Sequence, residues 1–206
     1  MARALRRQGL APTLIIDGGA NVGQFARAMV ETFPEAHVHS FEPLPDVAAE
    51  FRRHLGDHPR VTLHETALGA SEGTIPFFRN DYTLASSALP SASGDQPVEQ
   101  LEVRLSTLDA VMRDVEFPPS ALLKLDLQGY ELEALRGGPA TLDRMRHVLL
   151  EIALRPAYVG EPPFEALYDF MRAAGFRFLR PVEVLQGPGR EIVQMDALFE
   201  RIRPEY

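Results

Sequence analysis

The sequence contains no cysteine, and its hydrophobic runs are short. Without cysteine the chain can form no disulfide, no thiolate metal site and no thiol nucleophile. This composition fits a reducing compartment, and we expect a cytoplasmic protein. The longest apolar runs are too short to span a bilayer, so we expect no membrane segment and no membrane partner.

Basic residues are also in the minority. The chain has 21 Lys and Arg residues against 29 Asp and Glu residues, which leaves a net charge of −8. This charge repels phosphate backbones and anionic membranes, and it argues against bulk nucleic-acid binding. A chain of 206 residues with 45% hydrophobic composition can bury roughly 70% of the surface that its unfolded form exposes. We therefore expect one domain over residues 1–206, with a helix or tail at 1–12.

Buried strands and amphipathic helices alternate along most of the chain. The apolar runs predict strands at 13–17, 36–41, 60–65, 121–126, 147–152, 176–179 and 192–198. Apolar residues at helical spacing predict helices at 25–33, 44–55, 106–112, 130–135 and 164–174, with Ser106 as the cap of the third. Such alternation predicts an α/β fold with a mostly parallel sheet covered by helices on both faces.

One part of the chain departs from this alternation. Residues 74–79 and 99–105 alternate between apolar and polar, so they could pair as antiparallel strands. The segment 80–98 between them is rich in Ser, Ala, Pro and Gly and shows no periodicity. A connection of about 19 residues is long for a compact domain. We expect a mobile loop on the side of the site where an acceptor would bind.

The first predicted strand runs through Asp17 into a glycine-rich turn and then a helix. Gly18, Gly19 and Gly23 allow positive φ angles and remove the Cβ atoms that would keep a ligand away from the backbone. The helix that follows would direct its N-terminus toward that ligand. Glu42 lies about 19 residues beyond Gly23, where dinucleotide sites place the acid that binds ribose hydroxyls. The turn therefore predicts a cofactor with an adenosine half.

The residues of the turn also indicate which group is attached to the adenosine half of this cofactor. A nicotinamide dinucleotide is the first candidate, because Gly18 and Gly23 match the outer glycines of its fingerprint. However, Ala20 stands where the middle glycine is needed, and Asp17 would add negative charge beside a pyrophosphate. An acid suits a ligand with an ammonium and a sulfonium group. These features favour S-adenosylmethionine, with its amino-acid end near Asp17 and its ribose at Glu42.

Four segments resemble, in order, the motifs of FkbM-type methyltransferases. They are Asp-Gly-Gly-Ala-Asn-Val-Gly at 17–23, Phe-Glu-Pro at 41–43, Ala-Leu-Gly at 67–69 and Lys-Leu-Asp-Leu-Gln-Gly-Tyr-Glu at 124–131. The resemblance extends over about 14–178. It implies a class I methyltransferase with S-adenosylmethionine as donor and usually a hydroxyl acceptor. The implied fold is a Rossmann-like three-layer sandwich, whose mostly parallel seven-stranded sheet has an antiparallel C-terminal strand.

The resemblance also implies places for parts of the cofactor. Asp17, Gly19 and Asn21 would line the methionine end, and the region of Thr66 and Ala67 would approach the adenine. The full set of residues that we expect to bind the cofactor is Asp17, Gly18, Gly19, Ala20, Asn21, Gly23, Glu42, Pro43, Thr66, Ala67 and Asp126.

Carboxylates at the strand ends are the candidates for catalysis. The carboxyl ends of parallel strands meet at one edge of a sheet, so Asp126 and Glu151 should lie near the cofactor. An alcohol acceptor must lose a proton, which requires a base or a metal. We expect Asp126 to be the base, and Glu151 could share Mg²⁺ with it. Alternatively, Asp126 accepts hydrogen bonds from the backbone amides of Gln128 and Gly129 in a structural turn.

The acceptor side has the fewest interpretable patterns. Arg155 and Tyr158 follow the Glu151 strand and are candidates for its wall, and the resemblance adds Ser86 and Ser87. We expect a small-molecule hydroxyl acceptor, such as a sugar or another metabolite, and a homodimer is one arrangement that would complete the pocket. Three alternatives stay open: an N-methyltransferase, an NAD(P)-dependent oxidoreductase and a cofactor-binding protein without turnover.

Overall fold

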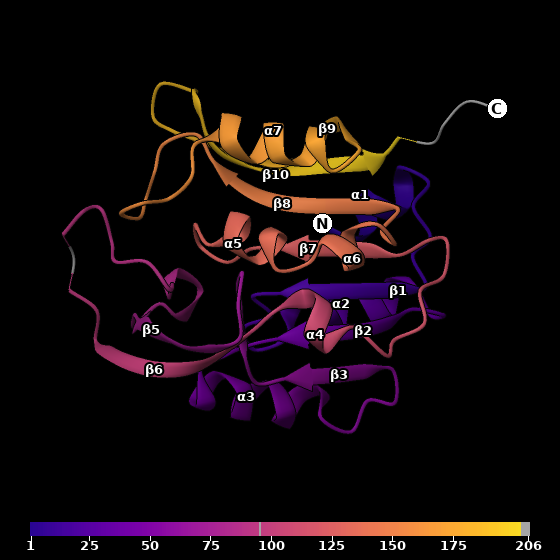
Figure 1. Ribbon diagram of the computed structural model, residues 1–206, viewed down its shortest axis with the longest axis horizontal. Coiled ribbons are helices and arrows are strands. Elements are labelled where there is room, and N and C mark those ends of the chain that lie inside the picture. The colour runs from indigo at the N-terminus through magenta and orange to yellow at the C-terminus, as the bar shows by residue number, and fades with distance from the viewer. Residues whose placement is uncertain (95, 203–206) are drawn as a thin grey trace.

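The computed structural model describes residues 1–94 and 96–202 (Figure 1). Among these residues, seven strands form the larger sheet in the order β3-β2-β1-β7-β8-β10-β9. Its strands are β1 (Leu14–Gly18), β2 (His37–Phe41), β3 (Val61–His64), β7 (Leu122–Leu125), β8 (His147–Ala153), β9 (Phe176–Gln186) and β10 (Ile192–Arg201). β10 is antiparallel to β8 and β9, and the other pairs are parallel. The predicted sheet, with its antiparallel C-terminal strand, is confirmed.

Helices cover both faces of this sheet. One face carries α1 (Ala2–Arg7), α2 (Gln24–Thr32) and α3 (Pro45–Leu55). The other carries α4 (Leu108–Val111), α5 (Glu131–Arg136), α6 (Pro139–Leu142) and α7 (Phe164–Ala173), which lie in front of the sheet in Figure 1. Successive strand residues point to opposite faces, so Ile15 packs with α2 while Ile16 packs with α4 to α7. Burial on both faces explains why these strands read as continuous apolar runs.

The second sheet lies beside the first and bounds the site. It contains β4 (Ala67–Leu68), β5 (Gly73–Arg79) and β6 (Glu99–Ser106) in the order β4-β6-β5. β5 and β6 are antiparallel, as predicted from their alternation. The segment between them contains a short 3-10 helix, η1 (Thr83–Ala85). Residues 95 and 203–206, which fall within the predicted loop and domain, lie outside the described residues.

Two of the boundaries that differ from the predictions have a clear physical cause. Thr107, not Ser106, caps α4 by accepting a hydrogen bond from the Ala110 amide at 3.0 Å, because Ser106 still belongs to β6. β9 continues well past residue 179 and includes Pro181. Proline is tolerated there because β9 is the edge strand of the sheet. None of the helices formed by the described residues is long and apolar enough to cross a membrane.

The two-sided burial can be tested on β8. Leu149 and Leu150 are both fully buried but belong to the apolar clusters of opposite faces. Replacing either one with alanine should lower the free energy of unfolding by about 2–5 kcal/mol, measured by urea denaturation. The control Leu185→Ala, at a residue that is 57% exposed on β9, should change it by less than about 1 kcal/mol. A near-neutral result for one of the two β8 variants would contradict helices on both faces.

Candidate active site

Most of the predicted cofactor residues meet around one cavity at the carboxyl edge of the larger sheet. Gly19 follows β1, Glu42 follows β2 and Asp126 follows β7. The cavity holds about 600 Å³ of empty space, part of it open to solvent. Of the predicted site residues, those that line it are Gly19, Asn21, Glu42, Pro43, Thr66, Ala67, Ser86 and Asp126.

The glycine turn is shaped by the loop that follows β7. Gly19 has a φ of +74°, and a Cβ atom built there would lie 1.9 Å from the backbone oxygen of Asp126. This contact excludes any side chain at position 19. Gly23 begins α2 with a φ of +94°, and its missing Cβ makes room for the side chains of Phe51 and Leu55. Gly18, Ala20 and Gly23 are not among the residues that line the cavity, and they serve the packing of the turn.

Glu42 is held at the cavity by two backbone amides. Its Oε2 atom accepts a hydrogen bond from the Asn21 amide at 3.0 Å, and its Oε1 atom accepts one from the Leu44 amide at 2.9 Å. The side chain is 5% exposed, and burial raises its pKa to about 7. Each oxygen of a carboxylate can accept a second hydrogen bond. Glu42 is therefore oriented by the chain and still has acceptor capacity for a ligand.

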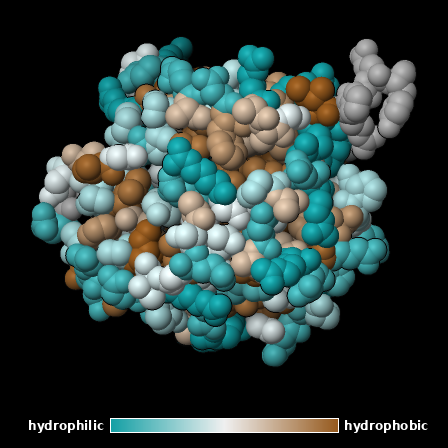
Figure 2. Space-filling view, viewed as in Figure 1, coloured by the Kyte–Doolittle hydropathy of each residue, from teal (hydrophilic) through white to brown (hydrophobic). Residues whose placement is uncertain are grey.

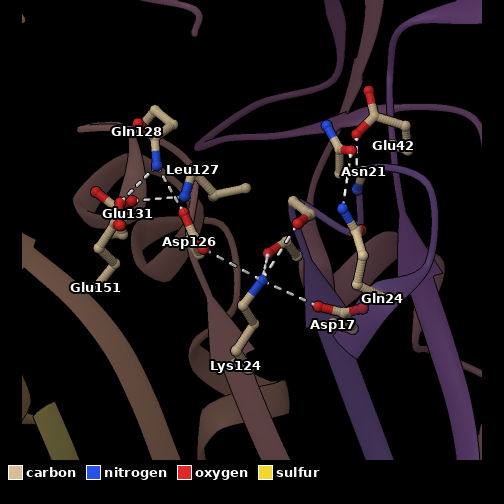
Figure 3. Close-up of polar contacts among 12 residues, drawn as sticks. Asp17, Asn21, Gln24, Glu42, Lys124, Asp126, Leu127, Gln128, Glu131 and Glu151 are labelled. Atoms are coloured by element: carbon tan, nitrogen blue, oxygen red, sulfur yellow. Dashed lines mark hydrogen bonds and ion pairs between the residues drawn. The ribbon is translucent and has the colours of Figure 1, made fainter. Parts of the chain in front are cut away.

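Lys124 contacts Asp17, the glycine turn and Asp126 at this edge of the sheet, as Figure 3 shows. Its Nζ atom lies 3.1 Å from Oδ1 of Asp17 and donates to the backbone oxygens of Gly18 and Gly19 at 3.2 Å each. The same ammonium lies 3.6 Å from Oδ2 of Asp126. Burial alone would lower the pKa of Lys124, but the charges of Asp17 and Asp126 outweigh this effect and raise it. Lys124 is therefore charged, and it binds two carbonyl groups of the glycine turn.

Asp17 is buried beside Lys124 and is not exposed to the cavity. Its side chain is 0% exposed and is not among the cavity-lining residues. Burial raises the pKa of Asp17, and the Lys124 ammonium opposes that rise. The acid therefore faces the chain's own cation. Lys124 has no role among the expectations from the sequence, although a lysine in a buried apolar strand requires a partner. Asp17 is its neighbour in the strand register.

Asp126 is the carboxylate of this group that reaches the cavity. Its side chain is 30% exposed, against 6% for Lys124 and 0% for Asp17. The alternative in which Asp126 binds the amides of its own turn is wrong. The amides of Leu127 and Gly129 donate instead to Oε1 of Glu131, at 2.6 Å and 3.4 Å. Asp126 therefore does not bind these two amides, and its carboxylate remains partly exposed at the cavity.

Glu151 lies behind Asp126 and is joined to it by an amide. The Nε2 atom of Gln128 donates to Oδ1 of Asp126 at 2.8 Å and to Oε2 of Glu151 at 2.7 Å (Figure 3). The other oxygen of Glu151 accepts from Gln194. Burial and the neighbouring carboxylates of Asp126 and Glu131 raise the pKa of Glu151.

The structure gives no support to the predicted magnesium site. Among the residues that the structure describes, no group of three or more His, Asp or Glu side chains is placed to hold a metal ion. Asp126 and Glu151 are bridged by the Gln128 amide, which supplies a donor to each. One oxygen of each carboxyl group therefore already accepts a hydrogen bond from the protein.

The segment around η1 lines part of the cavity. Thr83 accepts a hydrogen bond from the Asn21 side chain at 3.0 Å, and Ser86 lines the cavity. Ser87 is fully buried and donates to the backbone oxygen of Gln128 at 2.7 Å. Hydrophobic residues gather at the left of Figure 2, on the side where β5 lies in Figure 1. Tyr82 and Leu84 of the segment around η1 are exposed. That the segment moves stays a prediction.

The two candidates that follow β8 have different positions. The Tyr158 hydroxyl lies 2.7 Å from Oε1 of Gln128 and 3.1 Å from the backbone oxygen of Ala85. Tyr158 is thus connected to Asp126 and Glu151 through Gln128. Arg155 is exposed and does not line the cavity, so the structure does not bring it to the site.

Comparison with known proteins agrees with this geometry. The family model described as the methyltransferase FkbM domain matches residues 17–178. The chain belongs to this family. It is 29% identical over 171 residues to the 2-O-methyltransferase NoeI of Sinorhizobium fredii, a match that covers 77% of the chain and 70% of the relative. It is 25% identical over 151 residues to the hexuronic acid methyltransferase AglP of Haloferax volcanii, covering 73% of the chain and 60% of AglP.

Solved structures show the same fold. The crystal structure of methyltransferase FkbM from Methylobacillus flagellatus superposes with a TM-score of 0.58 at 13% identity. The match covers 97% of this chain and 48% of that one, so the chain spans about half the length of this structural relative. Family membership makes the chain a methyltransferase domain that depends on S-adenosylmethionine.

The role of Lys124 can be tested through stability. Lys124→Met removes the cation and leaves Asp17 buried without its partner, so the free energy of unfolding should fall by about 3–5 kcal/mol. Adding Asp17→Asn to this variant should recover part of the loss, because the unpaired charge is then gone. The control Arg27→Met breaks an exposed ion pair with Glu31 and should cost less than about 1 kcal/mol. Urea denaturation measures all three, and a double variant that is no more stable than Lys124→Met would contradict the pairing.

Proposed function

We propose that this FkbM methyltransferase domain transfers a methyl group from S-adenosylmethionine to a hydroxyl group of a small molecule. The observation that carries the proposal is that Glu42 and Asp126 line the same cavity. Glu42 has both oxygens oriented by backbone amides, and Asp126 has a partly exposed carboxylate. The relatives support an oxygen acceptor, since one is a 2-O-methyltransferase and another is a hexuronic acid methyltransferase.

The cavity fits the cofactor on chemical grounds. Glu42 can accept hydrogen bonds from the ribose hydroxyls, and the backbone of Gly19 and Asn21 can contact the methionine end. Thr66 and Ala67 mark the adenine region, which is bounded by apolar and aromatic side chains, as adenine requires. These side chains are Leu68, Phe77, Leu84, Leu127 and Tyr130. Asp17 supports this arrangement indirectly, because it holds Lys124 against the carbonyl groups of the glycine turn.

Once bound, the cofactor supplies an electrophilic methyl group on a sulfonium. The chain then has two tasks. It must hold the acceptor oxygen close to that methyl group, which can account for most of the rate enhancement. It must also take the hydroxyl proton, and Asp126 is the carboxylate at the cavity that can receive it.

Cofactor binding is the first test. S-adenosylhomocysteine should raise the melting temperature of the wild type, whereas NADH should not. Glu42→Gln should weaken S-adenosylhomocysteine binding by about 10- to 100-fold in calorimetry, because charge-assisted hydrogen bonds to the ribose are lost. The control Glu31→Gln, at an exposed residue, should bind normally. Stabilisation by NADH alone would favour the oxidoreductase.

Transfer itself is tested with labelled S-adenosylmethionine and a panel of sugars, uronic acids, other alcohols and amines. Asp126→Asn should still bind S-adenosylhomocysteine but should lose methyl transfer to hydroxyl groups by at least about 100-fold. Products on amines alone would indicate an N-methyltransferase. Cofactor binding without any methylated product would indicate a protein without turnover.

The raised pKa of Glu42 predicts opposite pH effects on binding and on stability. Affinity for S-adenosylhomocysteine should rise as the pH approaches about 7, because the ionised carboxylate binds the ribose. In the free protein, Glu42 costs stability as the pH rises from about 4.5 to about 7, since the folded state holds the proton more tightly than the unfolded state. Glu42→Gln should remove both trends, as calorimetry and urea denaturation at several pH values will show. A pH-independent affinity in the wild type would contradict the role of Glu42.

A further inference from the structure

Gln128 is the residue at which the segments around the site converge. Its Nε2 atom donates to Asp126 and to Glu151, and its Oε1 atom lies 2.7 Å from the Tyr158 hydroxyl. Its backbone oxygen accepts a hydrogen bond from Ser87 at 2.7 Å. These partners come from the turn after β7, from β8, from the loop after β8 and from the segment around η1. One residue, through its side chain and its backbone oxygen, therefore connects Asp126 to both predicted acceptor segments.

The backbone at Gln128 is unusual for a residue with a side chain. Its φ is +55°, in the left-handed region, and the next residue, Gly129, has a φ of +93°. A non-glycine residue in this region costs free energy and persists where its surroundings hold it in place. Here the four hydrogen bonds hold it. The strained turn directs the amide between the two carboxyl groups.

The chemistry of the amide matches its three side-chain partners. An amide nitrogen has two N–H donors, one for each carboxyl group, and its oxygen accepts the tyrosine proton. A leucine would leave Asp126 and Glu151 without these donors. A glutamate would keep the shape but would place a third acid against the two carboxyl groups.

Tyr158 extends this connection to the segment around η1. Its hydroxyl has a single proton but lies within hydrogen-bond distance of two acceptors, Oε1 of Gln128 and the backbone oxygen of Ala85. Burial raises the pKa of Tyr158, so the hydroxyl stays protonated and can donate. The loop after β8 is thereby linked to both Gln128 and Ala85.

We propose that Gln128 is a positioning residue, which holds the Asp126 carboxylate in the orientation needed to accept the hydroxyl proton. Through Ser87 and Tyr158 it also links that orientation to the two segments that would surround the acceptor. The inference rests on the proposed function, because it assigns Asp126 as the base of that reaction. Gln128 acts through Asp126 and takes no part in proton transfer itself.

Kinetics with a hydroxyl acceptor from the panel test this role. Gln128→Leu should lower kcat by about 10- to 100-fold, since a misoriented base slows the chemical step. The acceptor KM and the affinity for S-adenosylhomocysteine should stay within about threefold. Tyr158→Phe should lower kcat less, because it removes one contact of the amide and leaves both carboxyl contacts. The control Gln100→Glu, at an exposed position on β6, should behave as the wild type.

The pH dependence of kcat distinguishes a positioning role of Gln128 from a merely structural role. The titratable groups around this network are Lys124, Asp126, Glu131, Glu151, Tyr158, Glu161 and Asp196. In Gln128→Glu, the introduced carboxyl can donate a hydrogen bond to a neighbouring carboxylate only when it is protonated. The kcat of this variant, divided by that of the wild type at the same pH, should therefore rise as the pH falls. This variant keeps the shape of the side chain, so it also covers the case in which Gln128→Leu fails to fold.

The possible failures are distinguishable. A wild-type kcat in Gln128→Leu would overturn the positioning role and leave the proposed function intact. Equal losses of kcat, cofactor affinity and stability, with a flat ratio across pH for Gln128→Glu, would show a structural role and also overturn it. If the wild type methylates no hydroxyl acceptor, the proposed function and this inference both fail.

Discussion

The buried ammonium group of Lys124 is the charge on which this edge of the sheet depends. It lies in the strand between β1 and β8, and it contacts an acid of β1, two carbonyl oxygens of the glycine turn and the carboxylate of Asp126. Removing a charge from water is costly, so such a group needs several partners at once. Those partners are the parts that shape this edge of the candidate site. The position of the glycine turn and the position of Asp126 therefore have a common cause.

The two oxygens of the Asp126 carboxylate have different kinds of partner. Lys124 lies near one of its oxygens, and the Gln128 amide donates to the other. Behind it, Glu151 accepts from two amide side chains, those of Gln128 and Gln194. Acids that are buried together tend to stay protonated unless donors surround them. The site thus uses one cation and two amides to keep several acids close together while leaving one of them accessible.

The architecture was predictable because it follows from periodicity. Apolar runs and helical repeats predicted the parallel sheet, and the glycine turn with the spacing to Glu42 predicted that these residues meet at one edge of it. The roles of Lys124 and Gln128 were not predictable in this way. A single lysine in a strand and a single glutamine in a turn form no repeating sequence pattern. Their partners, such as Asp17 and Tyr158, are brought to them only by the fold. For the same reason Asp17 was expected to face a ligand, whereas its partner is within the chain.

The contact between Gly19 and the backbone of Asp126 limits how this enzyme can be redesigned. Any side chain at position 19 would collide with that carbonyl group and displace the loop that carries Asp126. The glycine turn is therefore not a separate module that can be exchanged without disturbing the loop that carries Asp126. If the proposed function holds, new acceptor preferences are better sought in the segments that contribute Leu84 and Tyr158, where substitutions leave this contact untouched.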